Sequence, residues 1–209
     1  MSWSSPISSP DDPHYTLPND WDSAAARLAL LGAAYDPASI ALAQRLGVRP
    51  GWRCLEAGAG GGSFARWLCS TALPGGRVLA VDTDPRHLTD RPRRGGEVAQ
   101  LNLVTDDIPQ NAFDFIHTRF VPLHIADRDL VIERLTRALA PGGVLVLEEG
   151  DTLGVLNEMS PGRAVIFRRG GSRPKARRDD GWDFCRHVDG GWTDGRTLRW
   201  SSMIAALRW

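Results

Sequence analysis

The sequence predicts an α/β fold, a doubly wound and mostly parallel sheet with helices before its first strand. Two observations lead to this prediction. Short apolar segments alternate with helical patterns from residue 52 to residue 149, which is typical of parallel strands joined by crossover helices. A glycine-rich turn, Gly58 to Gly62, directly follows the first apolar segment and precedes a helical pattern.

The N-terminal part predicts a leader and two helices. Residues 1–18 contain four prolines and several Ser and Asp residues, a composition typical of a mobile segment. An apolar stripe from Ala24 to Tyr35 predicts the first helix. Asp36-Pro37 predicts the start of the second helix, which ends near Leu46, because proline favours the first helical turn.

The middle part predicts five strands and three helices in alternation. We expect the strands at residues 52–57, 77–82, 98–103, 112–118 and 143–149, and the helices at 62–73, 85–90 and 127–139. Five strands in this rhythm form an open doubly wound sheet.

The C-terminal segment, residues 156–209, is atypical. Its last 49 residues, 161–209, contain ten arginines, seven glycines and four tryptophans without clear periodicity. Val165 to Phe167 indicate at most a short strand, and Ser201 to Leu207 at most a short helix. We therefore expect incomplete or atypical C-terminal strands and hypothesise a disordered or frameshifted tail. Nucleic-acid binding by its basic and aromatic residues is the less favoured interpretation.

The overall composition excludes a strongly charged or disulfide-rich protein. Twenty-five basic residues balance 25 acidic ones, so no net charge attracts nucleic acid or a membrane. Cys54, Cys69 and Cys185 are too few and too scattered for a disulfide framework or a metal site. The sequence shows neither a signal-peptide pattern nor a membrane-spanning apolar run. We expect a cytoplasmic protein without a metal or membrane partner and leave its oligomeric state open.

The glycine turn and an acidic residue together predict a nucleoside cofactor. Gly58 and Gly60 allow a ligand to approach the backbone closely. Asp82 closes the next predicted strand, 24 residues after Gly58, where a carboxylate can accept both ribose hydroxyls of an adenosine.

Two further residues distinguish between cofactors. A dinucleotide site usually has a third glycine where this chain has Ser63, and Glu56 would lie close to the pyrophosphate of NAD. S-adenosylmethionine instead carries an ammonium and a sulfonium, which a carboxylate stabilises. The residues favour S-adenosylmethionine, and an NAD-dependent oxidoreductase is the less favoured alternative.

Four motifs in order resemble the class I S-adenosylmethionine-dependent methyltransferases, in particular the small-molecule branch that includes quinone-biosynthesis enzymes. They are residues 54–63, 81–84, 112–117 and 139–146. The resemblance spans about residues 15–151 and implies a Rossmann-like domain, which we place at residues 19–155. It also implies transferase activity with S-adenosylmethionine as cofactor.

The resemblance suggests which residues hold the cofactor. Glu56 and the glycine backbone would hold the methionine end, and the loop after the third strand would hold the adenine. Asn102 stands where the family usually has Asp, so Asp106 and Asp107 in the same loop are the alternative candidates for binding the adenine. The cofactor-binding residues that we expect are Glu56, Gly58, Ala59, Gly60, Asp82, Thr83, Asn102, Leu103 and His117.

The sequence identifies no definite catalytic residue, and methyl transfer does not always require one. The methyl group of a sulfonium is already electrophilic, so the protein mainly aligns the acceptor, and a base is needed only for a poor nucleophile. His117 and His124 are the candidates for that base, although packing roles fit both. Tyr15 and Arg27 lie in a segment that resembles the family's cofactor-covering region, and Arg119 is a candidate for the edge of the site.

These observations predict a methyltransferase that acts on a small-molecule O, N or C acceptor. The alternative is a catalytically impaired cofactor-binding module, because the sequence shows no recognisable acceptor lid or C-terminal strand pair.

Overall fold

The computed structural model describes residues 23–73, 75–88, 96–149 and 163–169. The predicted leader with Tyr15 and the predicted helix from Ser201 to Leu207 lie outside these residues.

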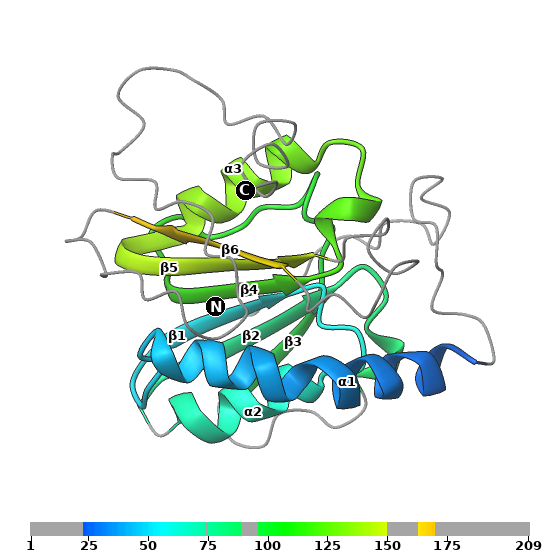
Figure 1. Cartoon of the computed structure of the whole chain (residues 1–209). Helices are drawn as coiled ribbons and strands as arrows, with labels where there is room; N and C mark the ends of the chain where they lie inside the picture. The colour runs from blue at the N-terminus through cyan, green and yellow to red at the C-terminus, as the bar shows by residue number, and fades with distance from the viewer. Residues whose placement is uncertain (1–22, 74, 89–95, 150–162, 170–209) are drawn as a thin grey trace.

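A six-stranded sheet forms the centre of the domain (Figure 1). Its strand order is β3-β2-β1-β4-β5-β6, and β6 alone is antiparallel to its neighbour. The order reverses between β1 and β4, which confirms the predicted doubly wound, mostly parallel sheet. The strands are β1 (Arg53–Ala57), β2 (Arg77–Asp82), β3 (Gly96–Gln100), β4 (Phe113–Arg119), β5 (Leu139–Glu149) and β6 (Arg163–Arg168).

Helices cover both faces of the sheet. Figure 1 shows α1 (Ala24–Arg45) and α2 (Ser63–Ala72) on one face and α3 (Arg128–Ala138) on the other. Side chains alternate between the faces along each strand. Cys54 and Phe115 pack with α1 and α2, whereas Leu55 and Ile116 pack with α3. None of the helices among the described residues has the length and apolarity to cross a membrane.

The predicted break between two N-terminal helices is wrong, because α1 is continuous and contains Pro37. A proline inside a helix removes one backbone hydrogen bond, here the bond to the carbonyl of Ala33. Ala33 and Pro37 are both exposed, so water can solvate that carbonyl. Arg119 binds Asp36 and Ser39 binds Glu148, and these contacts with the sheet hold α1 on both sides of the proline.

Several other boundaries differ from the prediction. The third strand ends at Gln100 instead of residue 103, so the following residues form a loop. The helix predicted at 85–90 is one short 3-10 turn, Pro85–His87, within the described residues. The strand expected at Val165 to Phe167 is part of β6, so the sheet continues past the predicted domain end at residue 155.

Candidate functional site

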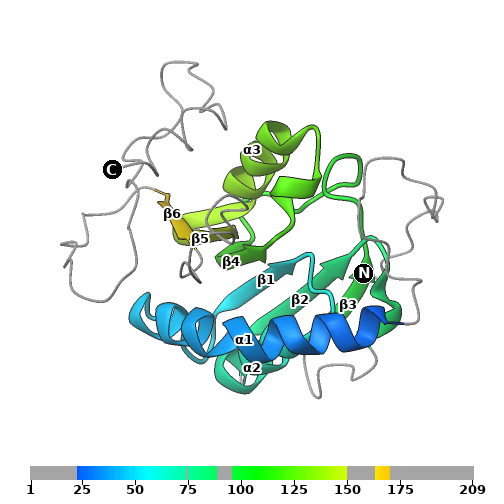
Figure 2. The same ribbon diagram turned by 45° about the vertical axis from the view of Figure 1, so that its right-hand side comes forward.

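A cavity of about 580 Å³ opens at the carboxyl ends of the strands, where the strand order reverses. Ligands of open α/β sheets bind at this position, and the volume is typical of small-molecule sites. The N-terminal half of α1 lies at this end of the sheet (Figure 2). The cavity is lined by the turn after β1, the end of β2, the loop after β3, the segment after β4, and α1.

The glycine turn after β1 is anchored to β2. The backbone N–H groups of Gly58 and Ala59 both donate to the carbonyl of Val81, at 2.8 and 2.9 Å. Gly58 has φ +78°, which favours glycine, and a Cβ there would lie 2.1 Å from Cγ2 of Val121. The absence of a side chain at Gly58 therefore lets the segment after β4 pack against the turn.

Asp82 lies at the end of β2 and faces the same turn. Its Oδ2 accepts a hydrogen bond from the N–H of Gly60 at 2.8 Å, and its Oδ1 accepts one from the N–H of Asp84 at 3.0 Å. Burial raises the pKa of Asp82, and these backbone bonds oppose that rise. A carboxylate has about four lone-pair positions, so Asp82 can still accept hydroxyl groups from the cavity that it lines.

The loop after β3 presents Asn102, Leu103 and Thr105 to the cavity, and Thr83 lines it from the end of β2. The side-chain oxygen of Asn102 accepts from the N–H of Val104 at 2.9 Å, so it shapes the loop.

Asp106 and Asp107 are the alternative candidates for binding the adenine. The carboxylate of Asp106 accepts a hydrogen bond from the N–H of Asn102 at 2.9 Å and so stabilises the loop itself. Asp107 is exposed and does not line the cavity.

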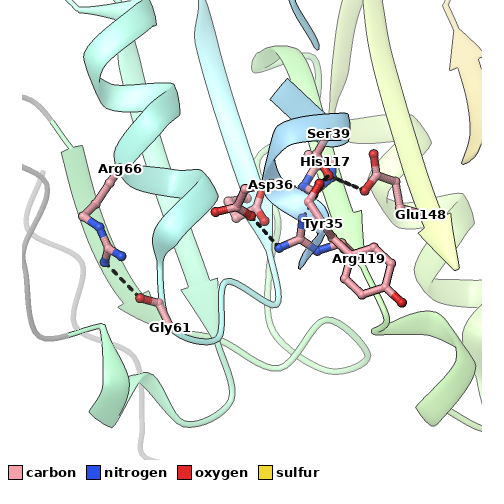
Figure 3. Close-up of polar contacts among 9 residues, drawn as sticks. Tyr35, Asp36, Ser39, Gly61, Arg66, His117, Arg119 and Glu148 are labelled. Carbon is pink, nitrogen blue, oxygen red and sulfur yellow. Dashed lines mark hydrogen bonds and ion pairs between the residues drawn. The ribbon is translucent and has the colours of Figure 1, made fainter. Parts of the chain in front are cut away.

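Glu56 lines the cavity, whereas His117 does not. The imidazole of His117 is fully buried, with its Nδ1 2.8 Å from Oε2 of Glu56. Its Nε2 lies 3.5 Å from Oε2 of Glu148 (Figure 3). Burial disfavours a charged imidazole, but Glu56 and Glu148 outweigh it and raise the pKa of His117 to about 9. The structure therefore does not place His117 where it could contact a cofactor or an acceptor.

His124 does line the cavity, together with Arg27 on α1. Burial lowers the pKa of His124, and the charge of Arg27 lowers it further. The imidazole is therefore neutral near pH 7 and able to accept a proton.

Arg119, at the cavity edge, donates to Asp36 at 2.8 Å and to Ser39 at 2.9 Å (Figure 3). These bonds join β4 to α1.

The charged residues around the glycine turn fit S-adenosylmethionine. Two carboxylates, Glu56 and Asp82, flank the glycine turn inside one cavity. A carboxylate beside the turn stabilises an ammonium or sulfonium and would repel the pyrophosphate of a dinucleotide.

The fold and this arrangement define a Rossmann-like domain for a nucleoside-containing cofactor. Residues 55–145 match the family model described as "Methyltransferase domain". This part of the chain is therefore similar to methyltransferase domains, and S-adenosylmethionine is the methyl donor of the class I methyltransferases.

Named relatives agree with this family. Methyltransferase str3 of Strobilurus tenacellus is 35% identical over 103 residues, which cover 48% of this chain and 36% of that protein. The ubiquinone/menaquinone biosynthesis C-methyltransferase UbiE of Vibrio cholerae is 32% identical over 111 residues, which cover 49% of this chain and 43% of that protein. The match thus spans less than half the length of each relative.

Solved structures share the fold. A SAM-dependent methyltransferase from Aquifex aeolicus has a TM-score of 0.50 and 20% sequence identity, over 60% of this chain and 72% of that chain. At this identity the likeness concerns the fold alone.

Proposed function

We propose that the chain transfers a methyl group from S-adenosylmethionine to a small-molecule acceptor. The observation that carries the proposal is the pair Glu56 and Asp82, which flank the glycine turn inside one cavity, in a part of the chain that is similar to methyltransferase domains. The name of one relative, a C-methyltransferase of ubiquinone/menaquinone biosynthesis, supports an acceptor of low molecular weight.

Each part of the cavity has a role in this proposal. Asp82 and Thr83 hold the ribose, Asn102 and Leu103 hold the adenine, and the turn with Glu56 holds the methionine end. The sulfonium of the bound cofactor supplies an electrophilic methyl group. The apolar lining side chains Leu28, Leu31, Leu123 and Ile125 exclude water and align the acceptor.

His124 is the group that can take a proton from the acceptor in this proposal. It lines the same cavity, and its lowered pKa keeps the imidazole neutral near pH 7. An amine acceptor that is already neutral needs no such base, whereas a hydroxyl acceptor does. The requirement for His124 therefore depends on the acceptor.

We also propose a cytoplasmic location. Cys54 and Cys69 are buried and form no disulfide, as expected for a protein kept in a reducing compartment.

A methyl-transfer screen tests the proposed activity. The full chain is incubated with S-adenosylmethionine labelled in its methyl group and with panels of phenols, hydroquinones and amines. We expect label in at least one panel, and much less label with Asp82→Ala, which removes the carboxylate that accepts the ribose hydroxyls. Binding of S-adenosylhomocysteine without transfer to any acceptor would instead indicate a cofactor-binding module, and the proposed activity would be wrong.

A further inference from the structure

Three neighbouring strands place polar side chains side by side on the face covered by α1 and α2. Glu56 on β1 is in register with His117 on β4, and His117 is in register with Val146 on β5, so Glu148 lies two residues further along β5 on the same face. On each of these strands the preceding residue of the same face is apolar and buried, namely Cys54, Phe115 and Val146. The polar side chains thus form a row at the carboxyl end of the sheet.

This row is almost completely buried. The exposed fraction is 1% for the His117 side chain and 5% for each glutamate side chain. The ring of Phe64 on α2 lies 4.1 Å from the ring of His117, centroid to centroid. Charged groups at such depth are stable only when they are paired, so the protonation of His117 and of the two glutamates is coupled.

Three side chains contact His117, namely Glu56 from β1, Glu148 from β5 and apolar Phe64 from α2. Further polar groups join this row through hydrogen bonds, Ser39 of α1 to Glu148, Arg119 of β4 to Ser39, and Asp36 of α1 to Arg119. Ser39 donates to Oε2 of Glu148 at 2.6 Å and accepts from Arg119 at 2.9 Å.

With His117 protonated, this cluster of described residues holds two cations and three carboxylates, which leaves one negative charge in excess. Arg119 is paired with Asp36, and Glu148 also accepts the hydrogen bond from Ser39. Glu56 is the carboxylate of the row that lines the cavity, so the excess charge faces the cofactor site.

We propose that His117 is a positioning residue, an imidazolium that donates to Glu56 and keeps this carboxylate ionised and directed at the cationic end of the cofactor. The inference rests on the proposed cofactor site. Burial raises the pKa of the Glu56 carboxyl, and the charge of His117 is the main opposing influence. Without that charge, burial raises the pKa of the Glu56 carboxyl further, so Glu56 attracts an ammonium only at higher pH.

The variant His117→Gln separates charge from position. A Gln side chain can still donate a hydrogen bond to Glu56, but it cannot be protonated. The affinity for S-adenosylhomocysteine, which retains the ammonium, is measured by isothermal titration calorimetry between about pH 6 and pH 9 in the wild type and the variant. Circular dichroism at each pH confirms that both proteins are folded.

We expect nearly constant affinity in the wild type. In His117→Gln we expect a loss of about tenfold at the acidic end, as for a carboxyl that is about nine-tenths protonated there, with recovery as the pH rises. An equal loss at every pH would indicate a purely structural role, and an unchanged affinity would indicate no role, so either result overturns the inference. If the wild type does not bind S-adenosylhomocysteine at all, the proposed function fails instead.

A second measurement needs neither a variant nor a cofactor. In wild-type protein with ¹⁵N-labelled histidine, the ring nitrogens of His117 are assigned by through-bond correlations near pH 7. We expect both nitrogens to carry protons. A neutral tautomer of His117 at that pH would overturn the inference.

Discussion

Asp82 accepts a hydrogen bond from the backbone N–H of Gly60 at 2.8 Å, and this bond joins the end of β2 to the turn after β1. The N–H groups of Gly58 and Ala59 donate to Val81 in the same place. The acidic residue and the turn are therefore fixed relative to each other before any ligand binds. Such preorganisation lowers the entropic cost of binding a cofactor.

Gly58→Ala should destabilise the protein more than Gly47→Ala. Both glycines have positive φ, +78° and +92°, where an L-residue costs about 1–2 kcal/mol. A Cβ at Gly47 meets nothing within 4 Å, whereas a Cβ at Gly58 would lie 2.1 Å from Val121. We expect a further loss of about 1–3 kcal/mol for Gly58→Ala in urea unfolding.

A double variant provides the control for this comparison. If Val121 causes the extra loss, Gly58→Ala with Val121→Ala should be less destabilised than the two single losses added together. Equal losses for Gly47→Ala and Gly58→Ala would show that Val121 does not restrict the turn.

The ion pair between Asp36 and Arg119 should couple strongly. Its N–O distance is 2.8 Å, and the two side chains are only 16% and 12% exposed. A double-mutant cycle with alanine substitutions, followed by urea unfolding, should give a coupling free energy of about 1–3 kcal/mol.

The pair between Arg53 and Asp114 is a matched control, because its distance is also 2.8 Å but its side chains are 46% and 28% exposed. We expect a coupling free energy of about 0.2–1 kcal/mol for such an exposed pair. A control coupling as large as that of Asp36 and Arg119 would contradict the role of burial in holding α1 on the sheet.

Pro37→Ala should stabilise the protein. In a continuous helix the alanine supplies the N–H that Pro37 lacks, and Pro37 is exposed, so little packing is lost. The expected gain is about 1–3 kcal/mol in the free energy of unfolding. If a helix instead began at Pro37, proline would be the favoured residue and the substitution would lower the stability.

Glu149→Gln should make the stability less dependent on pH. Burial raises the pKa of Glu149 to about 8, and the backbone of Leu123 and the charge of Arg128 only partly oppose it. The unfolded chain releases this proton near the ordinary pKa of 4.5, whereas the folded chain retains it up to about 8. The free energy of unfolding therefore falls as the pH rises through that window.

The measurement for Glu149 compares urea unfolding of wild type and variant at about pH 5 and pH 8. The variant should gain stability relative to the wild type as the pH rises, by roughly 3–4 kcal/mol. The exposed residue Glu97 supplies the control variant Glu97→Gln. A constant difference between Glu149→Gln and wild type would contradict the raised pKa.

The cavity residues next to the glycine turn could be predicted because their signals are local. A buried parallel strand appears as a short apolar run, and the glycines and Asp82 follow two such runs directly. Pro37 shows the limit of local signals. Proline favours a helix start in isolation, but the contacts of Asp36 and Ser39 with the sheet determine the helix in the fold.

The placement of His117 could not be predicted from local patterns. Side chains alternate between the two faces along strand 113–119, so the sequence alone predicts that Phe115 and His117 share one face. The contact with Glu56 also depends on the register of β1 against β4, residues 61 positions apart in the chain. A motif therefore identified His117 as a residue near the cofactor, whereas strand pairing places it beside Glu56.

Isothermal titration calorimetry with S-adenosylhomocysteine and NAD tests the central claim most directly, namely that Asp82 and the turn with Glu56 form a site for the adenosyl and amino-acid groups of S-adenosylmethionine and not for a dinucleotide. We predict saturable binding of S-adenosylhomocysteine by the wild type and no binding of NAD. Asp82→Ala should weaken the affinity by about tenfold or more, as for the loss of a charge-assisted hydrogen bond. Binding of NAD with equal or higher affinity, or undiminished binding of S-adenosylhomocysteine by folded Asp82→Ala, would contradict the claim.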